Sequence, residues 1–210
     1  MEKNVLTVFG EYESEKIIEK SKFLTYSAHV ESEEEARAFV AKIRSMHTLA
    51  THVCYAFIAD KLGNLQRFSD DGEPQGTAGV PILEVLKNKK LFETAVAVVR
   101  YFGGVKLGAG GLVRAYSSSA SENLAGADIR SLEVCKELYI TVPYTGVDGA
   151  QKYLAQNPCL ILSTDYSDKV TFLIAVKKPT AEAFEKGIID YLQGKVEIAA
   201  GQEYYMPFKL

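Results

Sequence analysis

The order of hydrophobic and polar positions divides the first part of the chain into alternating strands and helices. Residues 22–30 alternate with a period of two, which indicates a strand with one buried face. Ser32 and Glu35 follow with the spacing of a capping box at the start of a helix. The apolar stripe expected on that helix consists of Ala36, Phe39, Val40, Ile43 and Met46. Residues 51–60 predict a second strand.

The next elements surround a polar loop and a glycine-rich loop. The polar loop spans residues 69–79 and precedes a short predicted helix near residues 81–88. Residues 94–102 are apolar on both faces, which is typical of a central strand that is covered on both sides. The glycine-rich loop follows this strand, and we expect a helix over residues 111–125 after it.

The last part of the chain has a different pattern. It predicts a strand, a helix capped by Asp148, two strands joined by a turn, another helix and a final strand. These elements are expected at residues 133–142, 148–157, 160–166, 169–177, 180–193 and 196–204. The order β-α-β-β-α-β is that of a ferredoxin-like domain. We therefore predict an α+β protein with a boundary near Arg130, which gives domains at residues 1–130 and 131–210.

Composition restricts the class of protein. Hydrophobic residues make up 47% and charged residues 24% of the chain, as in ordinary globular proteins. No apolar stretch approaches the ~20 residues that a membrane span needs, and the first residues lack the apolar core of a signal peptide. The cysteines Cys54, Cys135 and Cys159 are odd in number and form no CxxC pair. We therefore expect a cytoplasmic protein without disulfides and without membrane contact.

Charge is unevenly distributed along the chain. The formal net charge is −3, which by itself gives no general attraction to nucleic acid. All six arginines lie within the first 130 residues, at Arg37, Arg44, Arg67, Arg100, Arg114 and Arg130. Because arginine can grip phosphate or carboxylate with two parallel hydrogen bonds, we expect any such recognition in the N-terminal domain.

The strongest local signal is the glycine-rich loop between the buried strand and the helix. Five glycines fall within nine residues, at Gly103, Gly104, Gly108, Gly110 and Gly111. A loop of this kind before a helix can present backbone amides to an anion. It matches neither a P-loop nor a dinucleotide fingerprint, so the sequence indicates no cofactor. The alternative is that the glycines provide positive φ angles and close packing between strand and helix.

Three basic residues accompany the same loop. Arg100 and Lys106 precede the predicted helix, and Arg114 falls in its first turn, where the helix dipole already presents positive charge. A cation there is unfavourable unless a negative group lies close by. We therefore predict that Arg100, Lys106 and Arg114, together with the loop glycines, bind an anion such as RNA phosphate. Internal carboxylates are the alternative partner.

The polar loop contains these internal candidates. Asp70, Asp71 and Glu73 place three carboxylates within four residues, and these groups repel one another unless they are neutralised. Oxygen clusters suit Mg²⁺ or Ca²⁺, but the ligand spacing of an EF-hand is absent. Ionic joints to Arg100 and Arg114, or roles in turns and caps, are the interpretation that we favour.

No catalytic arrangement stands out. His52 and Cys54 lie on one face of a predicted strand, but neighbours on one strand seldom have the geometry for proton transfer. Four serines in the predicted helix lack the glycine pattern of a nucleophile elbow, namely Ser117, Ser118, Ser119 and Ser121. We therefore assign no catalytic residue and no metal ligand from the sequence.

Four longer stretches follow the pattern of a known family. They are residues 20–23 (KSKF), 50–56 (ATHVCYA), 69–79 (SDDGEPQGTAG) and above all 100–116 (RYFGGVKLGAGGLVRAY). In this order they resemble the bacterial branch of the IMPACT family, over essentially the whole chain. The resemblance implies an N-terminal domain with the ribosomal-protein-S5 domain-2-like fold and a C-terminal ferredoxin-like domain. Both are similar to consecutive domains of elongation factor G.

The resemblance also implies a link to translation. Eukaryotic relatives restrain a stress kinase by competing for its ribosome-associated activator, largely through an extra N-terminal domain that we do not expect here. We therefore expect a binding protein rather than an enzyme, one that contacts RNA, the ribosome or translation factors through the glycine-rich loop. The alternatives are a metal-assisted hydrolase built on the polar loop with His52, and a protein-docking regulator that touches no RNA.

Overall fold

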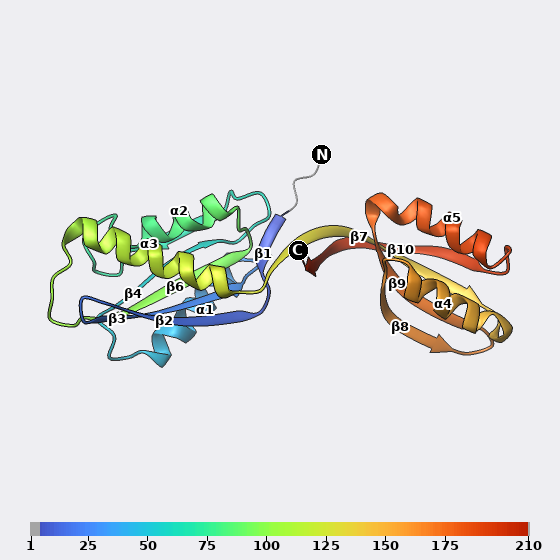
Figure 1. Cartoon of the computed structure of the whole chain (residues 1–210), viewed down its shortest axis with the longest axis horizontal. Coiled ribbons are helices and arrows are strands. Elements are labelled where there is room, and N and C mark those ends of the chain that lie inside the picture. The colour runs from blue at the N-terminus through green and yellow to red at the C-terminus, as the bar shows by residue number, and fades with distance from the viewer. Residues whose placement is uncertain (1–4, 210) are drawn as a thin grey trace. The chain divides into compact units, whose positions relative to one another are not determined.

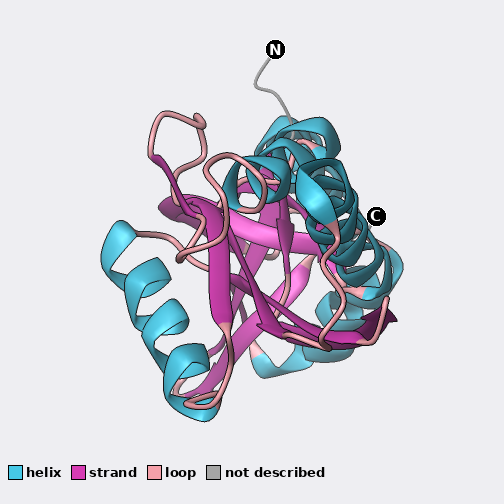
Figure 2. Cartoon of the chain, turned by 90° about the vertical axis from the view of Figure 1, so that its left-hand side faces the viewer, coloured by secondary structure: helices cyan, strands magenta, loops and turns pink. Residues whose placement is uncertain are grey.

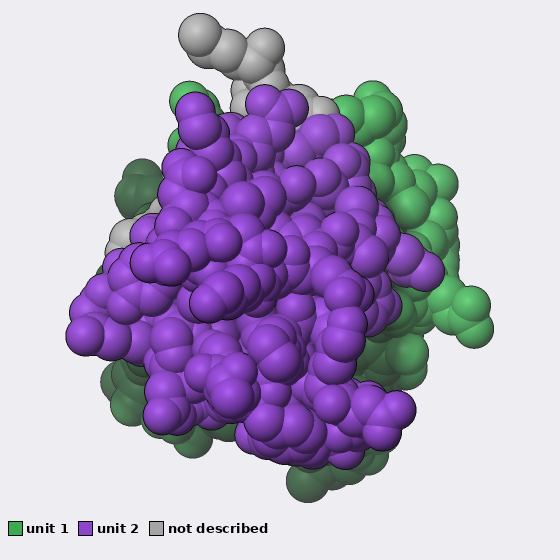
Figure 3. All heavy atoms as spheres, turned by 90° about the vertical axis from the view of Figure 1, so that its right-hand side faces the viewer, with its two compact units in different colours: residues 1–132, 207–210 green, residues 133–206 purple. Residues whose placement is uncertain are grey.

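The computed structural model describes residues 5–209 and divides the chain into two compact units. The first unit comprises residues 1–132 and 207–210, and the second comprises residues 133–206 (Figure 3). Each unit combines helices with antiparallel strands, which confirms the predicted α+β class (Figure 1). Among the described residues, no helix is both long enough and apolar enough to cross a membrane.

A five-stranded antiparallel sheet forms the centre of the first unit. Its strands, in spatial order, are β2 (Glu11–Ile18), β3 (Ser21–His29), β6 (Thr94–Tyr101), β4 (His52–Ile58) and β5 (Gln66–Ser69). The central strand β6 pairs with β3 on one side and β4 on the other, so Arg100 lies between Phe23 and His52. Nearly all of β6 is buried, as its run of apolar residues predicts.

Helices cover both faces of this sheet (Figure 2). One face packs against α1 (Glu33–Met46), which begins as predicted at Ser32, whose hydroxyl accepts a hydrogen bond from the Glu35 N–H. The other face packs against α2 (Gly79–Lys89) and α3 (Gly108–Gly126). Two apolar clusters result, one on each side of the sheet, because successive strand residues point to opposite faces.

A short strand at the start of the described chain belongs to the first unit but to a different sheet. β1 (Val5–Val8) pairs antiparallel with residues 129–132, at the start of β7 (Ile129–Val142). Val8 is fully buried in the apolar cluster beneath α2 and α3. The strand β1 and the start of β7, which lie far apart in the sequence, therefore pack together at one edge of the core of the first unit.

The second unit has the predicted order β-α-β-β-α-β. Its elements are β7, α4 (Val147–Gln156), β8 (Leu160–Tyr166), β9 (Val170–Lys177), α5 (Ala181–Tyr191) and β10 (Glu197–Lys209), with 3₁₀ turns at Tyr144–Gly146 and Lys178–Thr180. The strands lie in the order β10-β7-β9-β8, so β8 is an edge strand. A single core joins Leu138 and Phe172 of the sheet to Leu154 of α4 and Phe184 of α5.

Several elements differ from the sequence prediction, which contains no strand at β1, β2 or β5. β2 is an edge strand with mostly exposed side chains, so its sequence EYESEKII lacks a clear hydrophobic alternation. β5 is only four residues long and pairs with β4 alone. The predicted cap at Asp148 is wrong, because the preceding 3₁₀ turn leads into α4 earlier and makes Gly146 the N-cap.

Limited proteolysis of the native chain is expected to cut within residues 126–131, because Ala127 and Asp128 lie between α3 and β7 outside regular structure. Two resistant fragments should result, and their masses identify the cut. First cleavage within Thr94–Tyr101 or in the glycine-rich loop would contradict the predicted boundary near Arg130.

Candidate functional site

The carboxylate of Asp70 fixes the start of α2. It accepts hydrogen bonds from the backbone N–H groups of Gly76 at 2.8 Å, Ala78 at 3.0 Å and Gly79 at 2.8 Å. The first N–H groups of a helix have no partner within the helix, so a carboxylate placed there satisfies them and complements the helix dipole. Asp70 therefore has a structural role as a cap, as one of the sequence interpretations expected.

Asp71 ties the polar loop to two other elements. Its Oδ2 accepts a hydrogen bond from the Val53 N–H at 2.6 Å, and its Oδ1 accepts one from Arg44 Nη1 at 2.9 Å. Its own carbonyl oxygen lies 2.8 Å from His52 Nδ1. The loop is thereby attached to β4 and to the last turn of α1.

Glu73 forms a buried ion pair with Arg100. Its Oε1 accepts hydrogen bonds from Arg100 Nη1 at 2.6 Å and from the Tyr116 hydroxyl at 2.8 Å. Glu73 is 8% exposed and Arg100 5%. The guanidinium also lies 5.5 Å from the ring centre of Phe23 and 5.4 Å from that of Phe102. These contacts join the polar loop to β6 and α3, and we call them the Glu73–Arg100 joint.

The Glu73–Arg100 joint engages one of the residues that the sequence predicts to bind an anion, Arg100. Arg100 has its guanidinium turned to Glu73 and is shielded from water, so it does not belong to the exposed basic surface of this unit. Its predicted contact with an external anion stays a prediction. Tyr116 was missed by the sequence reasoning. It stands one turn after Leu112 on the buried stripe of α3, which was the available signal for its inward direction.

His52 and Cys54 do not form a catalytic pair in this arrangement. Cys54 donates a hydrogen bond from Sγ to the Asp70 carbonyl oxygen at 3.0 Å, and burial raises the pKa of its thiol to about 12. His52 Nε2 lies 3.8 Å from Glu73 Oε2 and faces the joint. Since only the thiolate is a good nucleophile, Cys54 is suited to packing.

Three positions of the glycine-rich loop require or favour glycine for structural reasons. A Cβ on Gly103 would lie 2.0 Å from the Lys20 carbonyl oxygen, so only glycine lets the loop approach the β2–β3 turn. Gly104 and Gly108 have φ angles of 84° and 68°, which favour glycine. Gly110 and Gly111 lie inside the first turn of α3. The packing alternative therefore accounts for part of the motif.

The first turn of α3 begins three residues before the predicted position, at Gly108 instead of residue 111. The buried side chains that start at Leu112 hold the helix against the sheet. Residues 108–110, two of which are glycines, extend the helix towards the loop. Arg114 consequently lies in the second turn of α3, so the prediction that it lies in the first turn is wrong. The N-cap is Leu107, which offers no side-chain acceptor to the N–H groups of the first turn.

An open groove of about 580 Å³ lies beside the loop. Lys106 and Arg114 line it together with Lys16 and Glu19 from the neighbouring β2–β3 hairpin. Lys16 is paired with Glu122. Lys106 and Arg114 are exposed, and within residues 5–208 neither side chain has an ion-pair or hydrogen-bond partner. The groove therefore presents two cations without a charged partner in that range. The sequence analysis did not identify Lys16, because it did not predict the strand β2 that carries this residue.

Replacing Glu73 with alanine is expected to lower the free energy of unfolding by about 3–5 kcal/mol, because Arg100 would keep a buried charge without its partner. Glu84→Ala is the matched control, since that glutamate is 53% exposed and pairs with Lys87 on the surface of α2. Its loss should stay below about 1 kcal/mol. Urea unfolding followed by circular dichroism measures both values. Equal decreases in the free energy of unfolding for the two variants would show that the Glu73–Arg100 ion pair is no more important for stability than a surface pair.

Cys54 is expected to resist alkylation in the native protein. With the pKa of its thiol raised to about 12 by burial, only about one thiol in ten thousand is ionised at pH 8. Iodoacetamide at pH 8 should therefore leave Cys54 unmodified until urea unfolds the chain, as peptide mass spectrometry would report. Rapid modification of the native protein would restore Cys54 as a candidate nucleophile.

Two family models match the chain, one in each unit. The model described as the Impact N-terminal domain matches residues 19–124, and the one described as a domain of unknown function (DUF1949) matches residues 140–195. A solved structure titled as that of a hypothetical protein is similar over 96% of this chain and 98% of its own, with 32% identity and a TM-score of 0.62. The fold is therefore shared along nearly the whole chain.

Curated relatives agree with these matches. The IMPACT family member YvyE of Bacillus subtilis is 39% identical over 194 residues, which cover 92% of this chain and 89% of the relative. YigZ of Escherichia coli, also named an IMPACT family member, is 35% identical over 188 residues, covering 89% and 92% of the two chains. With both domain models matched in order and relatives of this similarity along its length, the chain belongs to the IMPACT family.

Proposed function

We propose that the chain binds structured RNA of the translation machinery through the groove beside the glycine-rich loop. The observation that carries the proposal is the pair of exposed, unpartnered cations in this groove, Lys106 and Arg114. Inward-facing carboxylates neutralise Arg44 and Arg100 elsewhere in the same unit, whereas these two charges have no partner among the described residues. A phosphate group is the ligand that such a pair of charges fits best.

Two further features of the groove, and one of the loop beside it, suit a polynucleotide. The uncapped first turn of α3 adds partial positive charge near Lys106. Arg114 carries a planar guanidinium that can hold two phosphate oxygens at once. Phe102 begins the loop and is 47% exposed, so its ring can stack on an unpaired base. The Tyr101 hydroxyl instead forms a hydrogen bond with His47 Nδ1 at 2.9 Å, so this ring is engaged within the unit.

The overall charge makes this local surface decisive. With a formal net charge of −3, the protein gains little from general attraction to RNA, so binding must depend on the groove. The link to translation that the IMPACT family resemblance implies supports ribosomal or other structured RNA as the target. The contacts expected are phosphate contacts, which fix position but do not read sequence.

The double variant Lys106→Ala/Arg114→Ala is expected to lose co-sedimentation with ribosomes and to bind structured RNA more weakly, whatever its sequence. The matched control is Lys152→Ala/Lys186→Ala, which removes the same charge from two exposed positions of the second unit. Fluorescence anisotropy at several salt concentrations measures affinity. The slope of log K against log salt should fall by about one unit for each lost phosphate contact.

The fold should survive the double substitution, because both side chains are exposed and unpartnered among the described residues. Circular dichroism and urea unfolding check this point. A folded double variant that binds RNA as the unmodified chain does would show that the groove is not the binding site. An unmodified chain that binds no RNA would favour the protein-docking alternative.

A further inference from the structure

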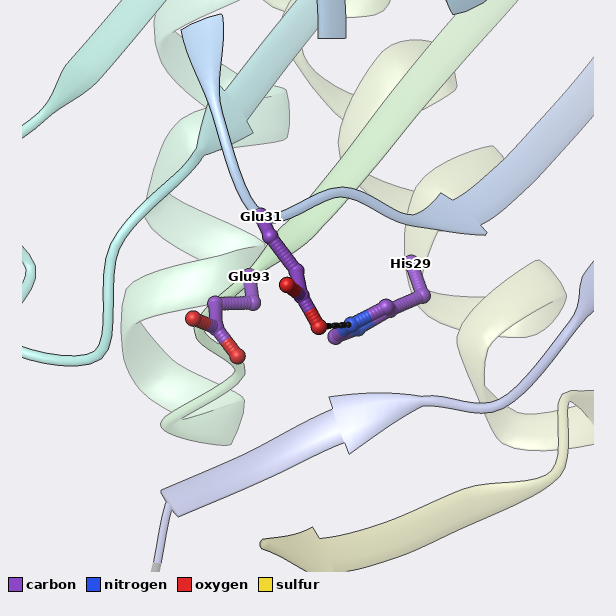
Figure 4. A group of neighbouring side chains, drawn as sticks. All are labelled: His29, Glu31 and Glu93. Atoms are coloured by element: carbon purple, nitrogen blue, oxygen red, sulfur yellow. Dashed lines mark hydrogen bonds and ion pairs between the residues drawn. The ribbon is translucent and has the colours of Figure 1, made fainter. Parts of the chain in front are cut away.

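Three side chains meet at the end of the first unit's sheet where β3 finishes and β6 begins (Figure 4). His29 closes β3, Glu31 lies in the link to α1, and Glu93 directly precedes β6. One potential ligand atom from each residue lies within 4.8 Å of the other two. An imidazole and two carboxylates at this spacing form a donor set for a metal ion.

Glu93 carries the unusual feature of this cluster. The residue is 3% exposed, and Lys61 Nζ lies 2.9 Å from its Oε1. The other oxygen, Oε2, is buried and has no hydrogen-bond partner within the described structure. Figure 4 shows this carboxylate beside the side chains of Glu31 and His29. A buried carboxylate oxygen without a donor is costly, and in the described part of the chain Oε2 lacks a donor or cation of its own although Lys61 pairs with Oε1.

The ring of His29 is held in an orientation that suits a ligand. Its Nδ1 lies 2.8 Å from the Thr7 hydroxyl, and that hydroxyl also lies 3.0 Å from the Glu93 carbonyl oxygen. When Thr7 donates to the carbonyl, it accepts from Nδ1–H, which leaves Nε2 as the ring nitrogen that can hold either a hydrogen or a metal ion. Nε2 faces Glu31 Oε1 at 3.1 Å, a hydrogen bond in which an Nε2–H donates, and a bound metal ion would take the place of that hydrogen.

We propose that His29, Glu31 and Glu93 bind a divalent transition-metal ion such as Zn²⁺ or Mn²⁺. The imidazole favours these ions over Mg²⁺ and Ca²⁺, which prefer oxygen ligands alone. Ligands about 2.1 Å from one ion lie roughly 3.4 Å apart, so the site must contract from its present spacing. The side chain of Glu31 is 64% exposed and free to supply this movement.

The exposed side chain of Glu31 lets an ion approach from solvent, and a bound ion would link three elements of the first unit. A groove of about 320 Å³ passes His29 and the start of α1, and Lys42 within it is held by Glu11. Bound metal would connect the end of β3, the start of α1 and the start of β6. Lys61 is the competing cation, but it occupies Oε1 and leaves Oε2 for the ion. Metal binding should therefore stabilise the folded chain.

The test uses the full chain after removal of metal with a chelator. Isothermal titration with ZnCl₂, MnCl₂ and MgCl₂ measures affinity and stoichiometry, and the melting temperature is recorded with and without each salt. We expect one equivalent of Zn²⁺ or Mn²⁺ to bind and to raise the melting temperature. Glu31→Gln and Glu93→Gln should each weaken binding at least about tenfold. Glu34→Gln is the control, because this exposed residue loses the same charge three positions from Glu31.

Three outcomes would overturn the proposal. The first is an unmodified chain that binds neither Zn²⁺ nor Mn²⁺ at concentrations up to about 0.1 mM. The second is Glu31→Gln binding as tightly as Glu34→Gln, which would place the ion elsewhere. Because Glu31 is exposed, this comparison holds even if Glu93→Gln does not fold. The third is Mg²⁺ binding with the same affinity as Zn²⁺, which would exclude a role for the imidazole.

Discussion

Glu73 and Arg100 meet in the interior of the first unit, where both side chains are almost fully shielded from water. Either charge alone would cost several kcal/mol there, so the polar loop cannot leave β6 without a large penalty. Through Asp70 the same loop fixes the start of α2, and through Tyr116 it is held to α3. Because Arg100 stands near the end of β6, this contact also determines where the glycine-rich loop begins.

The paired strands β3 and β6 separate the two proposed binding regions. They run antiparallel from Lys22 opposite Tyr101 to His29 opposite Thr94, eight positions that span roughly 25 Å. The groove lies at the end that leads into the glycine-rich loop, and the metal-ligand cluster lies at the other. Occupants of the two regions would therefore not compete for space. Coupling between them would have to pass through the sheet itself.

The sequence predicted elements whose periodicity reflects burial and missed those whose residues are exposed. β3, α1, β6 and the second unit follow their hydrophobic patterns, whereas β2 is a polar edge strand that only pairing with β3 reveals. The candidate site was harder to predict, because the local sequence does not show which charged side chains are buried against a partner. Arg100, Lys106 and Arg114 look equivalent along the chain, but only the fold brings Glu73 to Arg100. His29 and Glu93 likewise meet only through strand pairing.

The pairing of β1 with the start of β7 has a consequence for how the chain is made on the ribosome. Val5 is made before its partner Leu132, and all elements from β2 to α3 are made in between. At about 5–20 residues per second, the two appear roughly 6–25 seconds apart. During that interval the strand partner of Val8 is missing, and so are the α3 residues of its apolar cluster until they in turn are made. The nascent chain must therefore keep an unpaired strand from associating with its neighbours until synthesis passes residue 132.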